Sequence, residues 1–185
     1  MNGFKFFLLA GLLLISSFFL INKAGVSTYQ KTIQDSIPLK NKQVLDYVIK
    51  NGLKISPTYE TAVCTELVIA VLSNFATLTK EDKKRIRIIT DQDVYLLRRN
   101  NSPIPKGVYH ALTSSGKGTA IHHIEDVKPG DFVQFWYPNW GHCGIVSSID
   151  SVNKTMQLHS SFPSTNGYGI QSFDIPDECY FVRLN

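Results

Sequence analysis

The helix-type patterns of this sequence precede its strand-type patterns, and this order limits the folds open to the chain. Apolar residues recur at the spacing of an amphipathic helix over 41–51 and 61–76. In the last third, short apolar or alternating runs predict strands at 132–137, 144–149, 156–160 and 180–184. Helices followed by a run of strands are typical of an α+β domain, with N-terminal helices packed on an antiparallel sheet.

The middle of the chain has weaker patterns. We expect a short helix at 91–98, a loop at 100–106 where two prolines occur, and an irregular segment at 109–120, which is rich in Gly, Ser and Thr. The densest charged run, 80–87, contains acidic as well as basic residues, and this mixture favours a solvated helix face or a loop.

Length and charge set further limits. A chain of 185 residues with 43% hydrophobic residues suits one domain, which we place at 27–185. The net charge of +4 is compatible with an anionic cell envelope. Because long Lys/Arg blocks are missing from the sequence, we expect no nucleic-acid partner.

Residues 1–26 are predicted to be a signal peptide or a signal anchor. Residues 6–21 form an apolar run after Lys5, short for a membrane-spanning helix and suited to the apolar region of an export signal. The sequence leaves open whether this segment is removed or anchors the protein through 6–21. Either outcome predicts an exported domain that is periplasmic, secreted or membrane-anchored.

Cys64 lies near the start of the predicted 61–76 helix, a position that favours nucleophilic chemistry. A thiol attacks a carbonyl as the thiolate, and a free cysteine with a pKa of about 8.5 is mostly protonated at neutral pH. Unpaired N–H groups and the helix dipole favour the thiolate, and the same groups can stabilise an oxyanion. Cys64 is therefore a candidate nucleophile, with a buried structural cysteine as the alternative.

Two histidines follow on neighbouring predicted strands. His142 lies at the start of one strand between Gly141 and Cys143, where small neighbours leave room for a partner and a substrate. His159 lies one hairpin later, so we expect the two imidazoles to be cross-strand neighbours. In that arrangement His142 is the general base, and His159 orients it and fixes its tautomer.

Four segments, TAVCTELV, VKPGDFVQFW, GHCGIV and LHSS, occur in an order that resembles the NlpC-like peptidoglycan cysteine peptidases and the related CHAP-like amidases. The resemblance covers roughly 59–160. It implies a papain-like (NlpC-like) fold with a catalytic set of Cys64, His142 and His159. It also implies that Gly130 and Asp131 form the turn before the first core strand.

The sequence departs from that pattern around the nucleophile. These families usually have Asp before the cysteine and Ser-Gly after it, whereas Val63 precedes Cys64 here and Thr65-Glu66 follows. The departure concerns the substrate subclass rather than the fold or the nucleophile.

Aromatic residues near the predicted site are candidates for substrate contact. Trp140 lies in a Pro-Asn-Trp-Gly loop before His142, and Tyr59 precedes Cys64 by five residues. We expect no metal and no cofactor, because adjacent strand residues such as His142 and Cys143 point to opposite faces. Cys143 and Cys179 both fall in predicted strands, which leaves open a disulfide or two separate buried thiols.

These features predict a cysteine hydrolase that cleaves an amide bond in bacterial cell-wall peptidoglycan peptides, as an amidase or an endopeptidase. The sequence does not choose between housekeeping remodelling and an antibacterial toxin, whose partner would be an inhibitor or immunity protein. Two alternatives stay open: a non-catalytic envelope binding module, and a papain-like thiol acyltransferase or hydrolase acting on lipid.

Overall fold

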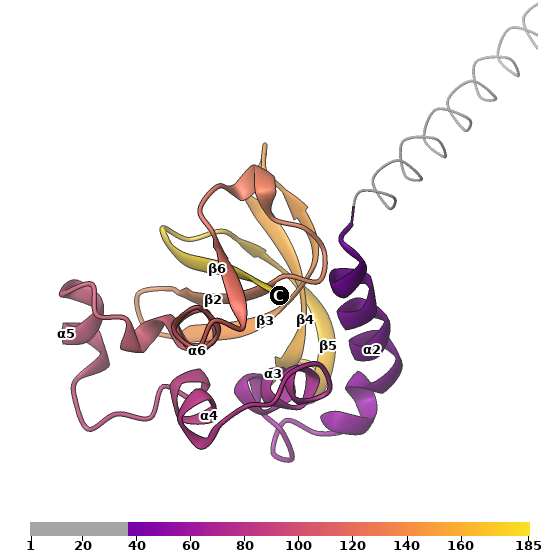
Figure 1. Cartoon of the computed structure of the whole chain (residues 1–185), viewed down its shortest axis with the longest axis horizontal. Helices are drawn as coiled ribbons and strands as arrows, with labels where there is room; N and C mark the ends of the chain where they lie inside the picture. Colours follow the sequence, from indigo (N-terminus) through magenta and orange to yellow (C-terminus); the bar gives the residue numbers. More distant parts are fainter. Residues whose placement is uncertain (1–36) are drawn as a thin grey trace, which may run out of the picture. The chain divides into compact units, whose positions relative to one another are not determined.

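Six strands form one antiparallel sheet in the order β1-β6-β2-β3-β4-β5 (Figure 1). The strands are β1 Gly118–Ile121, β2 Phe132–Trp136, β3 Gly141–Asp150, β4 Thr155–Phe162, β5 Gly167–Asp174 and β6 Glu178–Leu184. Strands β2 to β5 follow one another as a meander, and β6 returns to pair with β2. The sheet is therefore a meander extended at one edge by the last strand and by β1.

The computed structural model describes residues 37–185, and the chain from Pro38 onward forms one compact unit. The predicted export segment, 1–26, lies outside the described residues. Within 37–185, no helix combines the length and the apolar character needed to cross a membrane.

The helices lie mainly in the first half of the described chain. They are α2 Leu39–Ile55, α3 Cys64–Ser73, α4 Lys80–Ile86, α5 Val94–Arg99 and α6 Gly107–Ser114, with short 3-10 turns η1 Ile104–Lys106 and η2 Ile124–Asp126. A capping box between Thr79 and Asp82 starts α4, which explains why the charged run folds as a helix.

The two faces of the sheet have separate cores. The helix face packs α2, α3, α4 and α6 against strand residues that include Phe132, Cys143, Ile145 and Val182. The other face buries strand residues against one another, among them Phe135, Val146, Leu158, Phe162 and Phe181. Side chains that alternate along one strand therefore enter different cores.

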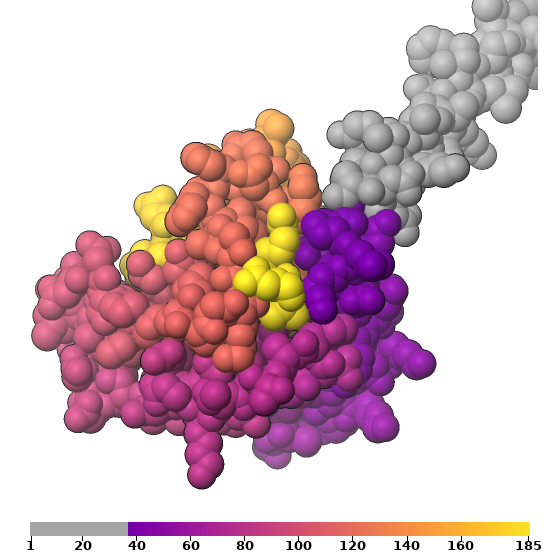
Figure 2. Space-filling view, viewed as in Figure 1, coloured from indigo at the N-terminus to yellow at the C-terminus, as the bar shows by residue number. Residues whose placement is uncertain are grey.

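A buried ion pair fixes the turn before β2. The fully buried Asp131 accepts hydrogen bonds from Nε and Nη2 of Arg183, from Nδ2 of Asn41 and from the N–H of Lys128, at 2.7–2.8 Å. Gly130 has φ +89, and an added Cβ would overlap Asn41 of α2. Figure 2 shows the C-terminal residues in yellow at the surface beside α2.

The predicted α+β class is confirmed, because helices pack on a six-stranded antiparallel sheet. The predicted helices at 41–51 and 61–76 correspond to α2 and α3, and α3 begins at Cys64 itself. The prediction that 109–120 is irregular is wrong, since α6 and β1 occupy most of it. Val108, Ala111 and Leu112 form a buried helical stripe that outweighs the local Ser and Thr residues.

Candidate active site

Cys64 is the first residue of α3, immediately after the extended residue Val63. Its side chain is partly buried and packs against the helix-face core. Among the described residues, no side chain caps this helix start. The first backbone N–H groups of α3 therefore remain available to an anion beside the thiol.

The surroundings of Cys64 lower the pKa of its thiol to about 4. The largest cause is hydrogen bonding with the thiol of Cys143, and a hydrogen bond and the charge of His142 lower the pKa further. Burial acts in the opposite direction but does not outweigh these contacts. Cys64 is therefore a thiolate at neutral pH.

A cavity of about 280 Å³ brings these groups together. Cys64, His142 and Cys143 line it, and Ile88, Val94 and Trp136 give it apolar walls. Arg87 stands at the same cavity and forms a two-point ion pair with Glu66 of α3, with N···O distances of 2.6 and 2.8 Å. The thiolate thus faces a small, largely apolar space with an ion pair beside it.

His142 is held by its backbone and by aromatic packing. The side chain of Gln134 donates a hydrogen bond of 3.0 Å to the backbone carbonyl of His142. The imidazole stacks on Phe162 at a centroid distance of 4.9 Å and an interplanar angle of 17°. It is only 7% exposed, and its buried Nε2 has no hydrogen-bond partner among the described residues. Aromatic stacking therefore supports the ring, which also interacts with the thiol of Cys64.

His159 lies away from His142, and the predicted contact between the two imidazoles is wrong. In the register of β3 and β4, His159 pairs with Ile145, whose side chain enters the helix-face core. The His142 ring instead packs on Phe162 and Phe173 of the other core, and it still reaches Cys64 at the cavity that both residues line. An offset of three residues thus sends the two histidines to opposite faces of the sheet.

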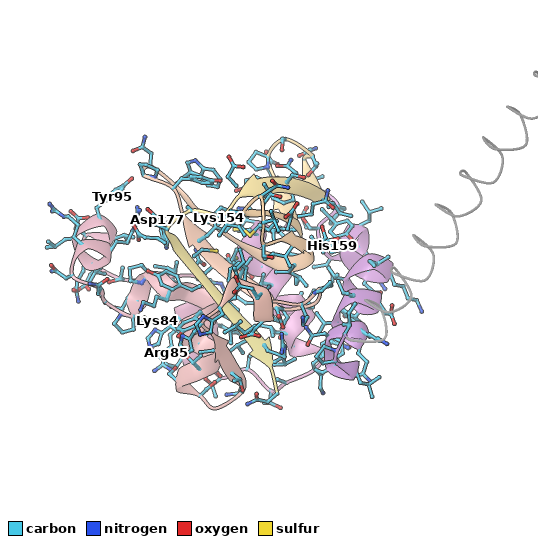
Figure 3. All side chains as sticks on the ribbon, turned by 90° about the horizontal axis from the view of Figure 1, so that it is seen from above. Lys84, Arg85, Tyr95, Lys154, His159 and Asp177 are labelled. Atoms are coloured by element: carbon cyan, nitrogen blue, oxygen red, sulfur yellow. The ribbon has the colours of Figure 1, made fainter. Side chains whose placement is uncertain are left out.

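The contacts of His159 are with β5. Its Nδ1 is 2.9 Å from the hydroxyl of Tyr168, and the two rings lie nearly parallel. Burial lowers the pKa of His159. Tyr168 also packs on Gly52 of α2, and Figure 3 shows His159 on the side of the molecule where α2 lies. His159 therefore belongs to the contact between the sheet and α2.

The two aromatic candidates lie near the cavity in different ways. Trp140 is 46% exposed in the β2–β3 loop, and its ring centroid is 6.4 Å from that of His142. Tyr59 is half-buried before α3; burial raises the pKa of its hydroxyl, and the charges of Cys64 and Cys143 raise it further. Both positions are therefore compatible with substrate contact.

Sequence reasoning missed Gln134 and Phe162. Gln134 is buried, lines the cavity and holds the backbone of His142, while Phe162 supports the imidazole ring. A polar residue between Val133 and Phe135 in a buried strand was the available signal for Gln134. No comparable signal marked Phe162, because an apolar residue in a strand is ordinary core.

The disulfide that the sequence left open between Cys143 and Cys179 does not form. Both cysteines are free. Cys143 of β3 pairs with Gln134 and Cys179 of β6 pairs with Phe135, so the strand β2 separates them. They also belong to different cores, on opposite faces of the sheet. The thiol that Cys143 approaches is that of Cys64.

Within residues 37–185, no three His, Cys, Asp or Glu side chains are grouped so that they could hold a metal ion. Comparison with family models, curated proteins and solved structures gives no match to this chain. The geometry and electrostatics of the site are therefore the main basis for assigning a function.

The pH dependence of alkylation tests the state of Cys64. Since only the thiolate reacts, a pKa of about 4 predicts an iodoacetamide rate that stays flat from neutral pH down to mildly acidic pH and falls as the pH drops through about 4. Mass spectrometry of the labelled peptides measures this rate. Cys179 is an internal comparison, because burial raises its pKa to about 12. A rate at Cys64 that rises towards pH 8–9, as for a free thiol with a pKa of about 8.5, would contradict the lowered pKa.

Proposed function

We propose that this protein is a cysteine hydrolase with Cys64 as the nucleophile and His142 as the general base. The observation that carries the proposal is the position of the Cys64 thiol at an uncapped helix start, in a cavity shared with His142, where its pKa is lowered to about 4. A buried structural cysteine has no need of a lowered pKa. Apolar surroundings usually raise the pKa of such a thiol, as burial does for Cys179. The contrast between the two thiols favours an enzyme over a binding module.

The proposed reaction has two steps. The Cys64 thiolate attacks the carbonyl carbon of an amide, and the N–H groups at the start of α3 stabilise the oxyanion. His142 gives a proton to the leaving amine as the C–N bond breaks, which leaves an acyl group on Cys64. In the second step His142 takes a proton from water, the water oxygen attacks the acyl carbon, and the carboxylic acid leaves as the thiolate reforms.

The proposed substrate is an amide in the stem peptide or cross-link of bacterial peptidoglycan. Three features support it: the resemblance of the four segments to the NlpC-like and CHAP-like families, the predicted export segment, and the exposed aromatic ring of Trp140 near His142. A helix-borne cysteine packed on an antiparallel sheet also supports a papain-like fold. We place the enzyme outside the cytoplasm.

Digestion of purified peptidoglycan tests the function. Incubation with the protein is expected to release new amino termini, because each cleaved amide yields one. Release should persist with a chelator, stop after iodoacetamide treatment and be absent from a Cys64→Ala variant. Mass spectrometry of the fragments identifies the bond. Release that survives Cys64→Ala but stops with chelator would show the mechanism to be wrong. No release from any wall type would favour a binding module or a lipid-directed enzyme.

A further inference from the structure

Cys64 has a second thiol against it, and the hydrolytic reaction does not use this group. Cys143 is fully buried on the helix face of β3, within the core against which Cys64 packs. The two cysteines line the same cavity. The neighbouring thiol of Cys143 is also the largest cause of the lowered pKa of Cys64. A reactive thiolate and a buried thiol therefore lie side by side at one cavity.

The position of Cys143 is specific among the cysteines. Cys179, the third cysteine of the chain, lies on the opposite face of the sheet with β2 between it and Cys143. Only Cys143 can reach the sulfur of Cys64 without a rearrangement of the strands. This arrangement is that of a nucleophilic cysteine with a resolving partner.

We propose that Cys64 is a site of reversible oxidation by peroxide and that Cys143 resolves it as an intrachain disulfide. The disulfide itself depends only on the contact between the two thiols. Its consequence, loss of hydrolysis while the bond is present, rests on the proposed function. Because the nucleophile would be one half of the disulfide, oxidation and catalysis exclude each other at this site.

The chemistry balances with hydrogen peroxide as the oxidant. The Cys64 thiolate attacks one peroxide oxygen, and the new S–O bond gives the sulfenic acid, Cys64–SOH. The O–O bond breaks in the same step, and the hydroxide released takes up a proton to become water. The sulfur of Cys143 then attacks the sulfur of Cys64. The S–S bond forms, the S–O bond breaks, and hydroxide leaves with the proton of Cys143 as water.

The contact also explains when Cys143 becomes reactive. The pKa of Cys143 is raised well above its ordinary value, first by its hydrogen bond to Cys64, then by burial and by the charge of Cys64. Conversion of Cys64 to a neutral sulfenic acid removes the thiolate that accepts this hydrogen bond and carries this charge. Cys143 therefore keeps its proton while Cys64 is reduced and gives it up more readily once Cys64 is oxidised.

Peptide mapping after peroxide treatment tests the proposal. The reduced full-length protein is treated with hydrogen peroxide, quenched with N-ethylmaleimide and digested without reductant. We expect a cross-linked pair of peptides containing Cys64 and Cys143, lighter by two hydrogens and separated by dithiothreitol. A Cys179→Ser variant is the matched control and should give the same cross-link. Oxidation of Cys64 to sulfinic acid while Cys143 remains alkylatable would overturn the proposal.

A second readout separates this inference from the proposed function. After peroxide treatment, wall-cleaving activity should be lost and then recovered with dithiothreitol in wild type and in Cys179→Ser. In Cys143→Ser and Cys143→Ala, Cys64 should pass to sulfinic acid and activity should not return. If the cross-link forms but no wall preparation is cleaved, the oxidation site stands and the hydrolase assignment fails. If the wall is cleaved and no cross-link forms, the hydrolase assignment stands and the oxidation site fails.

Discussion

Replacing His142 with alanine is expected to lower turnover by about 10²–10⁴-fold, the usual contribution of a positioned acid–base group. The change removes both the hydrogen bond and the charge that His142 directs at Cys64. The pKa of Cys64 should therefore rise but stay below that of a free thiol, because the hydrogen bond with Cys143 remains. Steady-state cleavage of a soluble wall fragment measures the loss, and iodoacetamide labelling across pH measures the shift.

His159→Ala is the matched control for that experiment. It removes a buried imidazole from the neighbouring strand, but this imidazole is bonded to Tyr168 and faces away from His142. Its turnover should remain within a few-fold of wild type at temperatures where the variant is folded, and its alkylation profile should be unchanged. A loss of turnover as large as that of His142→Ala, together with a shifted pH profile of alkylation, would show that His159 takes part in catalysis.

Asp131→Ala is expected to lower the free energy of unfolding by about 3 kcal/mol, the low end of the range for breaking a buried ion pair. Arg183 loses its partner, and Asn41 and Lys128 each lose an acceptor. We expect the low end because the Arg183 side chain is 28% exposed and water can solvate part of its charge. The midpoint of thermal unfolding should fall by about 10 °C for a domain of this size.

Asp174→Ala provides the comparison for this second experiment. Asp174 is exposed at the end of β5, and its only described hydrogen bond outside the strand pairing uses the backbone carbonyl, which the substitution keeps. Its midpoint should change by no more than about 1–2 °C, as for an ordinary surface site. Equal midpoints for the two variants would mean that the network around Asp131 contributes little. If Asp131→Ala does not fold, Asp131→Asn, which keeps one acceptor oxygen, should lie between wild type and the unfolded variant.

Much of the fold could be predicted from periodicity because the elements concerned bury one clear face. The stripe of α3 and the apolar runs of β2 and β3 are of this kind. Strand β5 was missed because it is an edge strand, paired only with β4, in which Tyr168, Ile170 and Phe173 are separated by Gly, Gln and Ser without a regular alternation. Its formation depends on backbone pairing with β4, which no local pattern of its own sequence encodes.

In the candidate site, too, features set by local sequence could be predicted and features set by tertiary structure could not. The placement of Cys64 at a helix start could be predicted, since that position is defined by local sequence. The place of His159 could not, because it depends on the register between β3 and β4, where a small offset changes the face that a side chain occupies. The proximity of Cys64 and Cys143 could not be predicted either, because it joins a helix to a strand far along the chain.

The aromatic setting of His142 has a consequence for how the proposed base behaves when conditions change. A carboxylate or imidazole partner would hold the ring only over the pH range in which its own charge is suitable. Phe135, Phe162 and Phe173, which surround the ring, have no titratable group. The aromatic support of the ring therefore does not change with acidity, and it depends on how tightly the β-sheet is packed around His142.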